Sequence, residues 1–189
     1  MPSEVRAHLE TGRFHDIEVE DDVTAFMKYD DGKTGVFITT TGEAPGTNRL
    51  EIAAERGRLV LEGSSIKWIR NETPTAQFCE EAKTGFEKPN TWNIEIPFND
   101  NGEQHIGIFK NFVDAILNEG KLTAPAAEGI NSVELANSMI FSGLQDTTVK
   151  LPLDAEAYEK LLKANIANST HVKKVVESTG ADSGFNSSF

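Results

Sequence analysis

The 189-residue sequence contains a single cysteine, Cys79, and far fewer basic than acidic residues, and both shortages exclude classes of protein. One cysteine cannot form an intrachain disulfide. Glu80 and Glu81 follow it, and their negative charge disfavours the nucleophilic thiolate, so we expect a buried or inert thiol. The formal net charge of −12 argues against nucleic acid or an anionic membrane as the main partner.

Long apolar runs are also missing. No stretch approaches the length that spans a bilayer, and no basic segment followed by an apolar run stands at the start. We therefore expect a cytoplasmic protein without a membrane partner. An apolar fraction of 38% and a charged fraction of 25% are typical of a globular chain that can bury one core.

Motifs that hold cofactors, metals or nucleophiles are absent as well. No G-x-G-x-x-G follows a predicted strand and there is no P-loop, so we predict no cofactor-binding residue in this chain. The four histidines are far apart, which predicts no metal site. Residues 15–22 form an acidic cluster that we interpret as a solvated charged edge, with a fortuitous divalent ion as the weaker alternative. No nucleophile motif is present, so no catalytic residue is predicted.

The first hundred residues have the alternation of β-strands. Asp21 to Tyr29 places an apolar or aromatic residue at every second position, and the Asp31-Gly32 turn leads into a β-branched run from Thr34 to Thr41. Further strands are predicted at 49–53, 58–61, 66–70 and 92–97. Turns this short favour antiparallel pairing.

The second half has helical periodicity. Residues 103–118 carry an apolar stripe at three- and four-residue spacing, and residues 128–144 form a second helix with Ile130, Val133 and Met139 predicted to face inward. Small residues in that helix permit close packing. Residues 149–153 are predicted to be extended, and Asp154 is predicted to cap a third helix that runs to Leu162.

This order predicts an α+β fold, with an open, mainly antiparallel sheet and helices packed on one face. We expect residues 1–167 to form one substrate-binding and dimerisation domain, and the polar residues 168–189 to form a C-terminal tail without chemistry. The open sheet face predicts a homodimer, because such a face is commonly covered by a second subunit.

One loop stands out as a candidate binding site. The segment from Thr39 to Arg49 is long, polar and contains glycine and proline, and loops of this kind carry ligand contacts more often than tight turns do. Its hydroxyl, carboxylate, amide and guanidinium groups suit a polyol or sugar. We therefore predict substrate contacts from Thr40, Glu43, Asn48 and Arg49, with an ordinary surface loop as the alternative.

His105 is a further candidate for substrate binding. It lies at the start of the apolar stripe in the helix at 103–118. The alternative is a histidine at the edge of the core that is hydrogen-bonded to the backbone.

Several segments together resemble a known family. They are Val19-Glu-Asp-Asp-Val23, the hairpin at 32–35, Thr41-Gly-Glu-Ala-Pro-Gly-Thr-Asn-Arg-Leu-Glu-Ile52, Arg56-Gly57-Arg-Leu, Asn111-Phe-Val-Asp-Ala-Ile116, Glu128-Gly-Ile and Leu151-Pro-Leu-Asp154. Their order and spacing over most of the chain resemble the C-terminal domain of the glucose–fructose oxidoreductase / inositol dehydrogenase (Gfo/Idh/MocA) family.

This resemblance implies a fold like the C-terminal domain of dihydrodipicolinate reductase, and a parent protein with a separate Rossmann domain that binds NAD or NADP. It implies hydride transfer between nicotinamide and a carbinol carbon of a sugar or cyclitol, and dimerisation through the open sheet face. The Rossmann domain is absent from these residues. Glu87-Lys88-Pro89 matches the family's catalytic motif in letters, but it lies among strands of the sheet and is interpreted as an exposed turn.

The sequence thus predicts the substrate-binding and dimerisation part of an NAD(P)-dependent oxidoreductase, with a small polyol as partner. We expect these residues alone to be catalytically inactive, because hydride transfer needs a bound nicotinamide. The alternative is a non-catalytic binding or assembly protein on the same fold.

Overall fold

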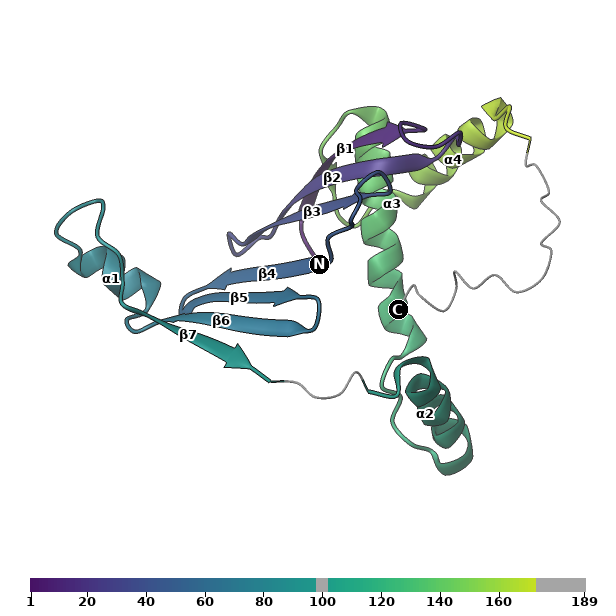
Figure 1. Ribbon diagram of the computed structural model, residues 1–189. Helices are drawn as coiled ribbons and strands as arrows, with labels where there is room; N and C mark the ends of the chain where they lie inside the picture. The colour runs from purple at the N-terminus through teal and green to yellow at the C-terminus, as the bar shows by residue number, and fades with distance from the viewer. Residues whose placement is uncertain (98–101, 173–189) are drawn as a thin grey trace. The chain divides into compact units, whose positions relative to one another are not determined.

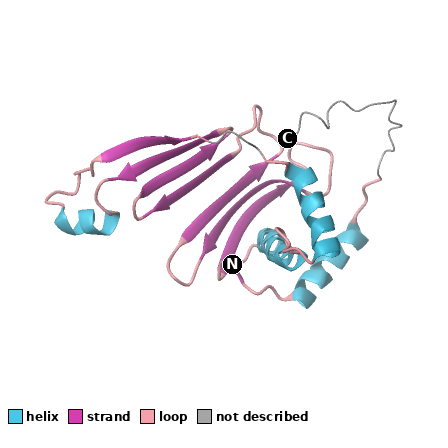
Figure 2. Cartoon of the chain, turned by 90° about the horizontal axis from the view of Figure 1, so that it is seen from below, coloured by secondary structure: helices cyan, strands magenta, loops and turns pink. Residues whose placement is uncertain are grey.

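The computed structural model describes residues 1–97 and 102–172 and divides into two compact units. The first unit comprises residues 1–42 together with the chain from Gly129 onward, and the second comprises Glu43–Glu128. Each unit contains one four-stranded sheet, and every strand pair among the described residues is antiparallel (Figures 1 and 2). The predicted α+β fold with antiparallel strands is confirmed, and its strands are shared between two sheets.

The sheet of the first unit has the order β3-β2-β1-β8. Its strands are β1 (Glu4–Thr11), β2 (Glu20–Lys28), β3 (Thr34–Thr40) and the two-residue β8 (Val149–Lys150). The β2–β3 connection is the predicted hairpin: Tyr29 N–H donates to Lys33 O at 3.0 Å, and Gly32 has a φ of 85°. This positive φ is readily adopted by glycine.

The core of the first unit lies between one face of this sheet and α3 (Gly129–Gln145). Val5, Ala7 and Ala25 from the sheet are buried against Met139 of the helix. Ala7 and Ala25 face each other across the β1–β2 pair, so small side chains on the sheet meet a long one on the helix. Figure 1 shows α3 running along this sheet.

Close packing of α3 on β1 depends on a glycine. A Cβ atom built on Gly143 would lie 2.5 Å from Leu9 Cδ2, so any side chain there would push the helix or Leu9 away. The prediction that small residues permit close packing is confirmed. The prediction that Ile130 and Val133 face inward is wrong: they are 68% and 59% exposed, because the buried positions of α3 begin only at Ser138.

Two buried serines of α3 serve different purposes. Ser142 Oγ accepts a hydrogen bond from Ala7 N at 2.8 Å and donates one to Thr147 O at 2.5 Å. On β1, only Glu4 and Val5 pair with β8. Ala7 lies beyond the end of this pairing, and Ser142 supplies the acceptor that its backbone N–H would otherwise lack. Ser138 Oγ donates to Glu134 O at 2.7 Å, which is a bond within the helix.

The helix α4 (Ala155–Asn168) begins where the sequence predicts. Asp154 Oδ1 accepts hydrogen bonds from the backbone N–H groups of Glu156 and Ala157, both at 3.0 Å, and so caps the helix. The predicted tail at 168–189 falls outside the described residues from 173 onward. No helix among residues 1–97 and 102–172 is both long and apolar enough to cross a bilayer.

The described residues of the second unit form a sheet in the order β4-β5-β6-β7, two α-helices and a 3₁₀ turn. The strands are β4 (Arg49–Ala54), β5 (Gly57–Glu62), β6 (Ser65–Asn71) and β7 (Thr91–Ile96). The helices are α1 (Thr75–Glu81), α2 (Gln104–Asn118) and the 3₁₀ turn Ala126–Glu128. Cys79 lies on α1 and is exposed, so the prediction that its thiol is buried is wrong.

The two faces of this second sheet differ in chemistry. Strand register places apolar side chains on one face, where Arg70 also stacks over Trp92 at 4.7 Å. That apolar face consists of Leu50, Ile52, Leu59, Leu61, Ile66, Trp68, Trp92, Ile94 and Ile96. The opposite face carries ion pairs from Arg49 and Arg58.

Candidate functional site

The candidate site lies in the first unit, where the loop from Gly12 to Val19 joins β1 to β2. Gly12 begins this loop with a φ of 61°, and its N–H donates to Val19 O at 3.3 Å. A Cβ at Gly12 would lie 2.6 Å from Ile17 O, so the loop closes tightly only with glycine at this position.

Asp21, at the start of β2, holds the loop from inside. Its carboxylate is fully buried and accepts backbone N–H bonds from Arg13 at 3.0 Å, Phe14 at 2.7 Å and His15 at 3.1 Å. Burial would by itself raise the pKa of the Asp21 carboxyl, but the three N–H donors outweigh it and hold that pKa below its ordinary value. Asp21 is therefore a buried, ionised anchor of the loop.

The interpretation of residues 15–22 as a solvated charged edge is wrong for Asp21, which is 3% exposed. Within the described residues, no three His, Cys, Asp or Glu side chains are grouped so that they could hold a metal ion. The reason is that backbone N–H groups, which are donors, occupy the oxygen atoms of Asp21 that a cation would need.

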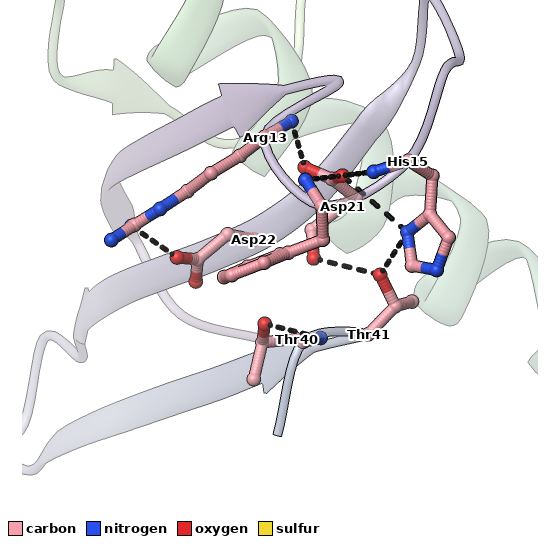
Figure 3. Close-up of polar contacts among 8 residues, drawn as sticks. Arg13, His15, Asp21, Asp22, Thr40 and Thr41 are labelled. Atoms are coloured by element: carbon pink, nitrogen blue, oxygen red, sulfur yellow. Dashed lines mark hydrogen bonds and ion pairs between the residues drawn. The ribbon is translucent and has the colours of Figure 1, made fainter. Parts of the chain in front are cut away.

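The His15 side chain is fixed by two neighbours, as Figure 3 shows. Its Nδ1 lies 3.1 Å from Thr41 Oγ1 and 3.6 Å from Asp21 Oδ2. Thr41 also donates its backbone N–H to Asp21 O at 3.0 Å and its hydroxyl to the same oxygen at 3.3 Å. The ends of β2 and β3 and the β1–β2 loop therefore form one polar network.

A pocket of about 260 Å³ lies beside this network, between the sheet and α3. Its apolar floor comes from β2, β3 and the helix, and its polar part from the carboxylates of Glu20 and Asp21 and three consecutive threonines. The complete lining is Glu20, Asp21, Val23, Phe37, Thr39, Thr40, Thr41, Ala136, Met139 and Ile140. Such a mixture can bind a small hydroxylated molecule, with hydroxyl groups toward the polar side and C–H groups on the floor.

One predicted contact residue, Thr40, lines this pocket. Its Oγ1 accepts a hydrogen bond from Gly42 N at 3.1 Å, so the side chain also shapes the turn after β3. Thr39 and Thr41 belong to the candidate loop but were not singled out as contacts, and Glu20 and Asp21 were not predicted at all.

The other predicted contacts belong to the second unit. Glu43 Oε1 accepts a hydrogen bond from Thr47 Oγ1 at 2.6 Å, while Asn48 is exposed. Arg49 is paired with Glu51 at 2.5 Å and Glu62 at 2.7 Å, and its hydrogen bond with Glu51 raises the pKa of the guanidinium.

His105 also belongs to the second unit. It is exposed in the first turn of α2. The Glu87-Lys88-Pro89 segment lies between α1 and β7, outside any helix or strand, with Glu87 and Lys88 exposed.

The described residues do not fit a dinucleotide. A pyrophosphate is bound where a glycine-rich turn joins a strand to the start of a helix. Two strand-to-helix connections are described over their whole length, residues 72–74 before α1 and residues 151–154 before α4, and neither contains glycine. No step of a reaction can therefore be derived through NAD(P) from these residues.

Comparison with known proteins identifies the type of domain. Residues 1–60 match the family model of the GFO/IDH/MocA C-terminal domain. No curated protein matches the chain.

Three solved structures share the fold. The WlbA dehydrogenase from Chromobacterium violaceum, solved with NADH and UDP-GlcNAcA, is 25% identical, with a TM-score of 0.59 over 81% of this chain and 41% of that one. An oxidoreductase domain protein from Kribbella flavida is 17% identical, with a TM-score of 0.57 over 80% and 46%. An oxidoreductase from Agrobacterium radiobacter, solved with NAD⁺, L-tartaric acid and magnesium, is 13% identical, with a TM-score of 0.55 over 79% and 43%.

The chain thus has the fold of the C-terminal part of oxidoreductases, two of which were solved with NADH or NAD⁺. The match of residues 1–60 to the model of the GFO/IDH/MocA C-terminal domain agrees with the resemblance found in the sequence. The chain spans about two fifths of the length of the WlbA structure.

Proposed function

We propose that this chain is the substrate-binding and dimerisation part of an NAD(P)-dependent oxidoreductase that acts on a hydroxyl of a sugar or cyclitol. The observation that carries the proposal is the pocket between β2, β3 and α3 in a chain that matches the model of this family's C-terminal domain. Its size of about 260 Å³ suits a small polyol. Bound nicotinamide would supply the hydride chemistry, and this chain would bind and orient the alcohol.

Threonine hydroxyl groups are suited to this ligand because each can both donate and accept a hydrogen bond. Thr39 faces Val23 across the β2–β3 pair, and Thr40 and Thr41 follow it at the polar end of the pocket. Phe37 and Met139 provide apolar surface for the C–H side of a ring. The pocket therefore offers both kinds of surface that a polyol presents.

The binding proposal is tested by NMR on the labelled chain with myo-inositol. We expect the backbone amide signals of residues 39–41 to shift with a saturable concentration dependence. Thr39→Val, which replaces a hydroxyl by a methyl group of similar size, should weaken binding several-fold. Thr24→Val, at an exposed position next to the buried Val23 and so on the opposite sheet face, is the matched control and should bind normally. Equal binding by both variants, or no shifts at all, would contradict the proposal.

The same proposal holds that these residues alone do not catalyse hydride transfer. The chain should give no saturable fluorescence change with NADH or NADPH, because neither described strand-to-helix connection supplies a phosphate-binding turn. Saturable micromolar binding would overturn this part. In the parent enzyme, Glu43, Asn48, Arg49 and His105 remain proposed contacts, and Arg49→Ala should raise KM for a polyol.

We also propose a cytoplasmic homodimer through the apolar face of the second sheet. Leu50 and Ile52 on this face are 55% and 49% exposed, and Trp92 is 50% exposed, which is typical of a surface that a partner covers. Arg70 stacked on tryptophan suits an interface centre, where these residue types are enriched.

Sedimentation of two matched variants tests the dimer. Leu61→Glu places a charge on the apolar face, and Lys67→Glu places one on the opposite face of the same sheet. We expect dimers for the wild-type chain and Lys67→Glu, and monomers for Leu61→Glu. A monomeric wild-type chain, or dissociation by both variants, would contradict this interface.

A further inference from the structure

Two segments of the first unit that are far apart in the sequence are held together by one carboxylate. Glu18 lies in the loop between β1 and β2, and Ser169 and Thr170 directly follow α4. Ser169 Oγ donates a hydrogen bond to Glu18 Oε2. Thr170 donates its backbone N–H, at 3.0 Å, and its hydroxyl, at 2.8 Å, to Glu18 Oε1. We call these three hydrogen bonds the clasp.

The clasp joins an ionised acceptor to donors on a packed helix. The bonds from Ser169 and Thr170 lower the pKa of the Glu18 carboxyl to about 2, so this group is charged at any physiological pH. Hydrogen bonds to an ionised acceptor are stronger than those between neutral groups. Ser169 also donates its backbone N–H to Ile166 O at 3.3 Å, and α4 itself contacts α3. The donors of the clasp are therefore held in place by the helices.

The clasp can open while the unit stays folded. Glu18, Ser169 and Thr170 are all exposed, so water can replace each partner when the bonds break. The attachment of the same loop through Asp21 is different, because that carboxylate is buried and would leave unpaired groups if its bonds to the loop were lost. The β1–β2 loop thus has one permanent and one releasable attachment.

The β1–β2 loop contacts the end of β3, which forms the polar part of the pocket. The Phe14 ring lies so close to Gly42 that a Cβ built on this glycine would be 2.5 Å from the ring atoms. His15 Nδ1 lies 3.1 Å from Thr41 Oγ1. Gly42 directly follows residues 39–41, which line the pocket. A displacement of the loop would therefore remove support from this side of the pocket.

We propose that the clasp regulates ligand binding in the pocket between β2, β3 and α3. When the clasp is closed, the loop supports the end of β3 and the pocket is ordered. When it is open, the loop and residues 39–41 gain mobility, and a ligand must order them again at a cost in conformational entropy. Linkage requires the reverse effect as well, so a bound ligand stabilises the closed clasp. The inference rests on the proposed function for the nature of the ligand.

Amide hydrogen exchange of the labelled full chain tests the clasp without any ligand. Glu18→Ala removes the acceptor of all three bonds, and we expect the amides of Arg13, Phe14 and His15 to exchange about fivefold to tenfold faster. Asp16→Ala, which removes an exposed acid of the same loop that is not part of the clasp, is the matched control and should exchange like the wild-type chain. Unchanged exchange in Glu18→Ala, or equal acceleration in both variants, would overturn the inference.

Thr170→Glu tests the clasp from its other side. The new carboxylate would face Glu18, and the repulsion between the two charges should open the clasp. We expect the amides of Arg13, Phe14 and His15 to exchange faster, as in Glu18→Ala. In a chain that already carries Glu18→Ala, the same substitution should have no further effect, because the repulsion partner is gone. Equal effects of Thr170→Glu in both backgrounds would show that the two residues act independently and would overturn the clasp.

A titration with myo-inositol separates this inference from the proposed function. In the wild-type chain we expect shifts of the amides of residues 39–41 and slower exchange of the amides of residues 13–15 at saturation. Glu18→Ala should bind several-fold more weakly, and Asp16→Ala should bind normally. Equal affinity of Glu18→Ala and the wild-type chain would overturn the regulation alone. No binding by the wild-type chain would reject the proposed ligand and, with it, the effect of the clasp on affinity, although faster exchange in Glu18→Ala would still support the clasp itself.

Discussion

The hydroxyl of Ser142 should be one of the strongest single contributors to the packing of α3 on its sheet. Ser142→Ala removes the acceptor of Ala7 N–H at 2.8 Å, beyond the point where β8 ends, and the donor to Thr147 O at 2.5 Å. An unpaired buried N–H costs about 1–3 kcal/mol, and the second lost bond about 1 kcal/mol. We therefore expect the free energy of unfolding to fall by roughly 2–4 kcal/mol.

Ser138→Ala is the matched control for this change. Ser138 is equally buried and lies one turn earlier on α3, but its hydroxyl donates to Glu134 O, a carbonyl within the helix. No strand N–H depends on it, so the expected loss is at most about 1 kcal/mol.

The assay must report on the first unit. Both tryptophans, Trp68 and Trp92, lie in the second unit, so their fluorescence would follow the wrong sheet. We would measure urea unfolding by far-UV circular dichroism and amide hydrogen exchange in β1. Faster exchange of Ala7 in Ser142→Ala than in Ser138→Ala is expected. Equal stability losses in the two variants would refute the argument that the hydroxyl completes the edge of β1.

Three further predictions follow from the same structure. Gly57→Ala should destabilise the second sheet, seen as earlier urea unfolding by tryptophan fluorescence, because φ is 110° and the new Cβ would lie 2.0 Å from Ile69 O. Gly143→Ala should cost about 1–3 kcal/mol by overpacking against Leu9, and Leu9→Ala in the same chain should recover part of that loss. Hydrogen bonds from Ser169 and Thr170, just beyond α4, lower the pKa of Glu18 from 4.5 to about 2. The attachment of Glu18 to these two residues is therefore fully present above pH 4.5 and is lost as the pH falls through about 2. The amide signals at the end of α4 should titrate near pH 2 in the wild-type chain and should not do so in Glu18→Gln.

Local signals in the sequence were sufficient for several elements. The β2–β3 hairpin follows from strict alternation and an Asp-Gly turn, and the cap of α4 follows from Asp154. These features depend on a few neighbouring residues, so no knowledge of tertiary contacts was needed. By contrast, the division of the strands into two sheets depends on pairing between distant segments, which composition does not encode.

Two elements were missed for different reasons. In β1, Val5, Ala7 and Leu9 alternate with polar residues, but a small alanine at the centre weakens the apolar signal. Ala7 is buried because it faces Ala25 and lies beneath α3. Both contacts are made by residues far away in the sequence, so the local pattern does not reveal them. The helix α1 has seven residues and none of them is buried. It is therefore too short, and lacks the apolar face, for a helical pattern to be recognised in the sequence.

Thr40 of the candidate site was predicted, but the role of Asp21 was missed, because a run of acidic residues usually forms a solvated edge and Asp21 is the buried exception. Asp21 has the same strand parity as Val23 and Ala25, so period-two alternation places its side chain on the buried face. A carboxylate in that position must find donors, and the nearest unpaired donors are the backbone N–H groups of the preceding loop. Strand parity, applied to polar as well as apolar residues, would therefore have predicted both the anchored loop and the fixed position of His15.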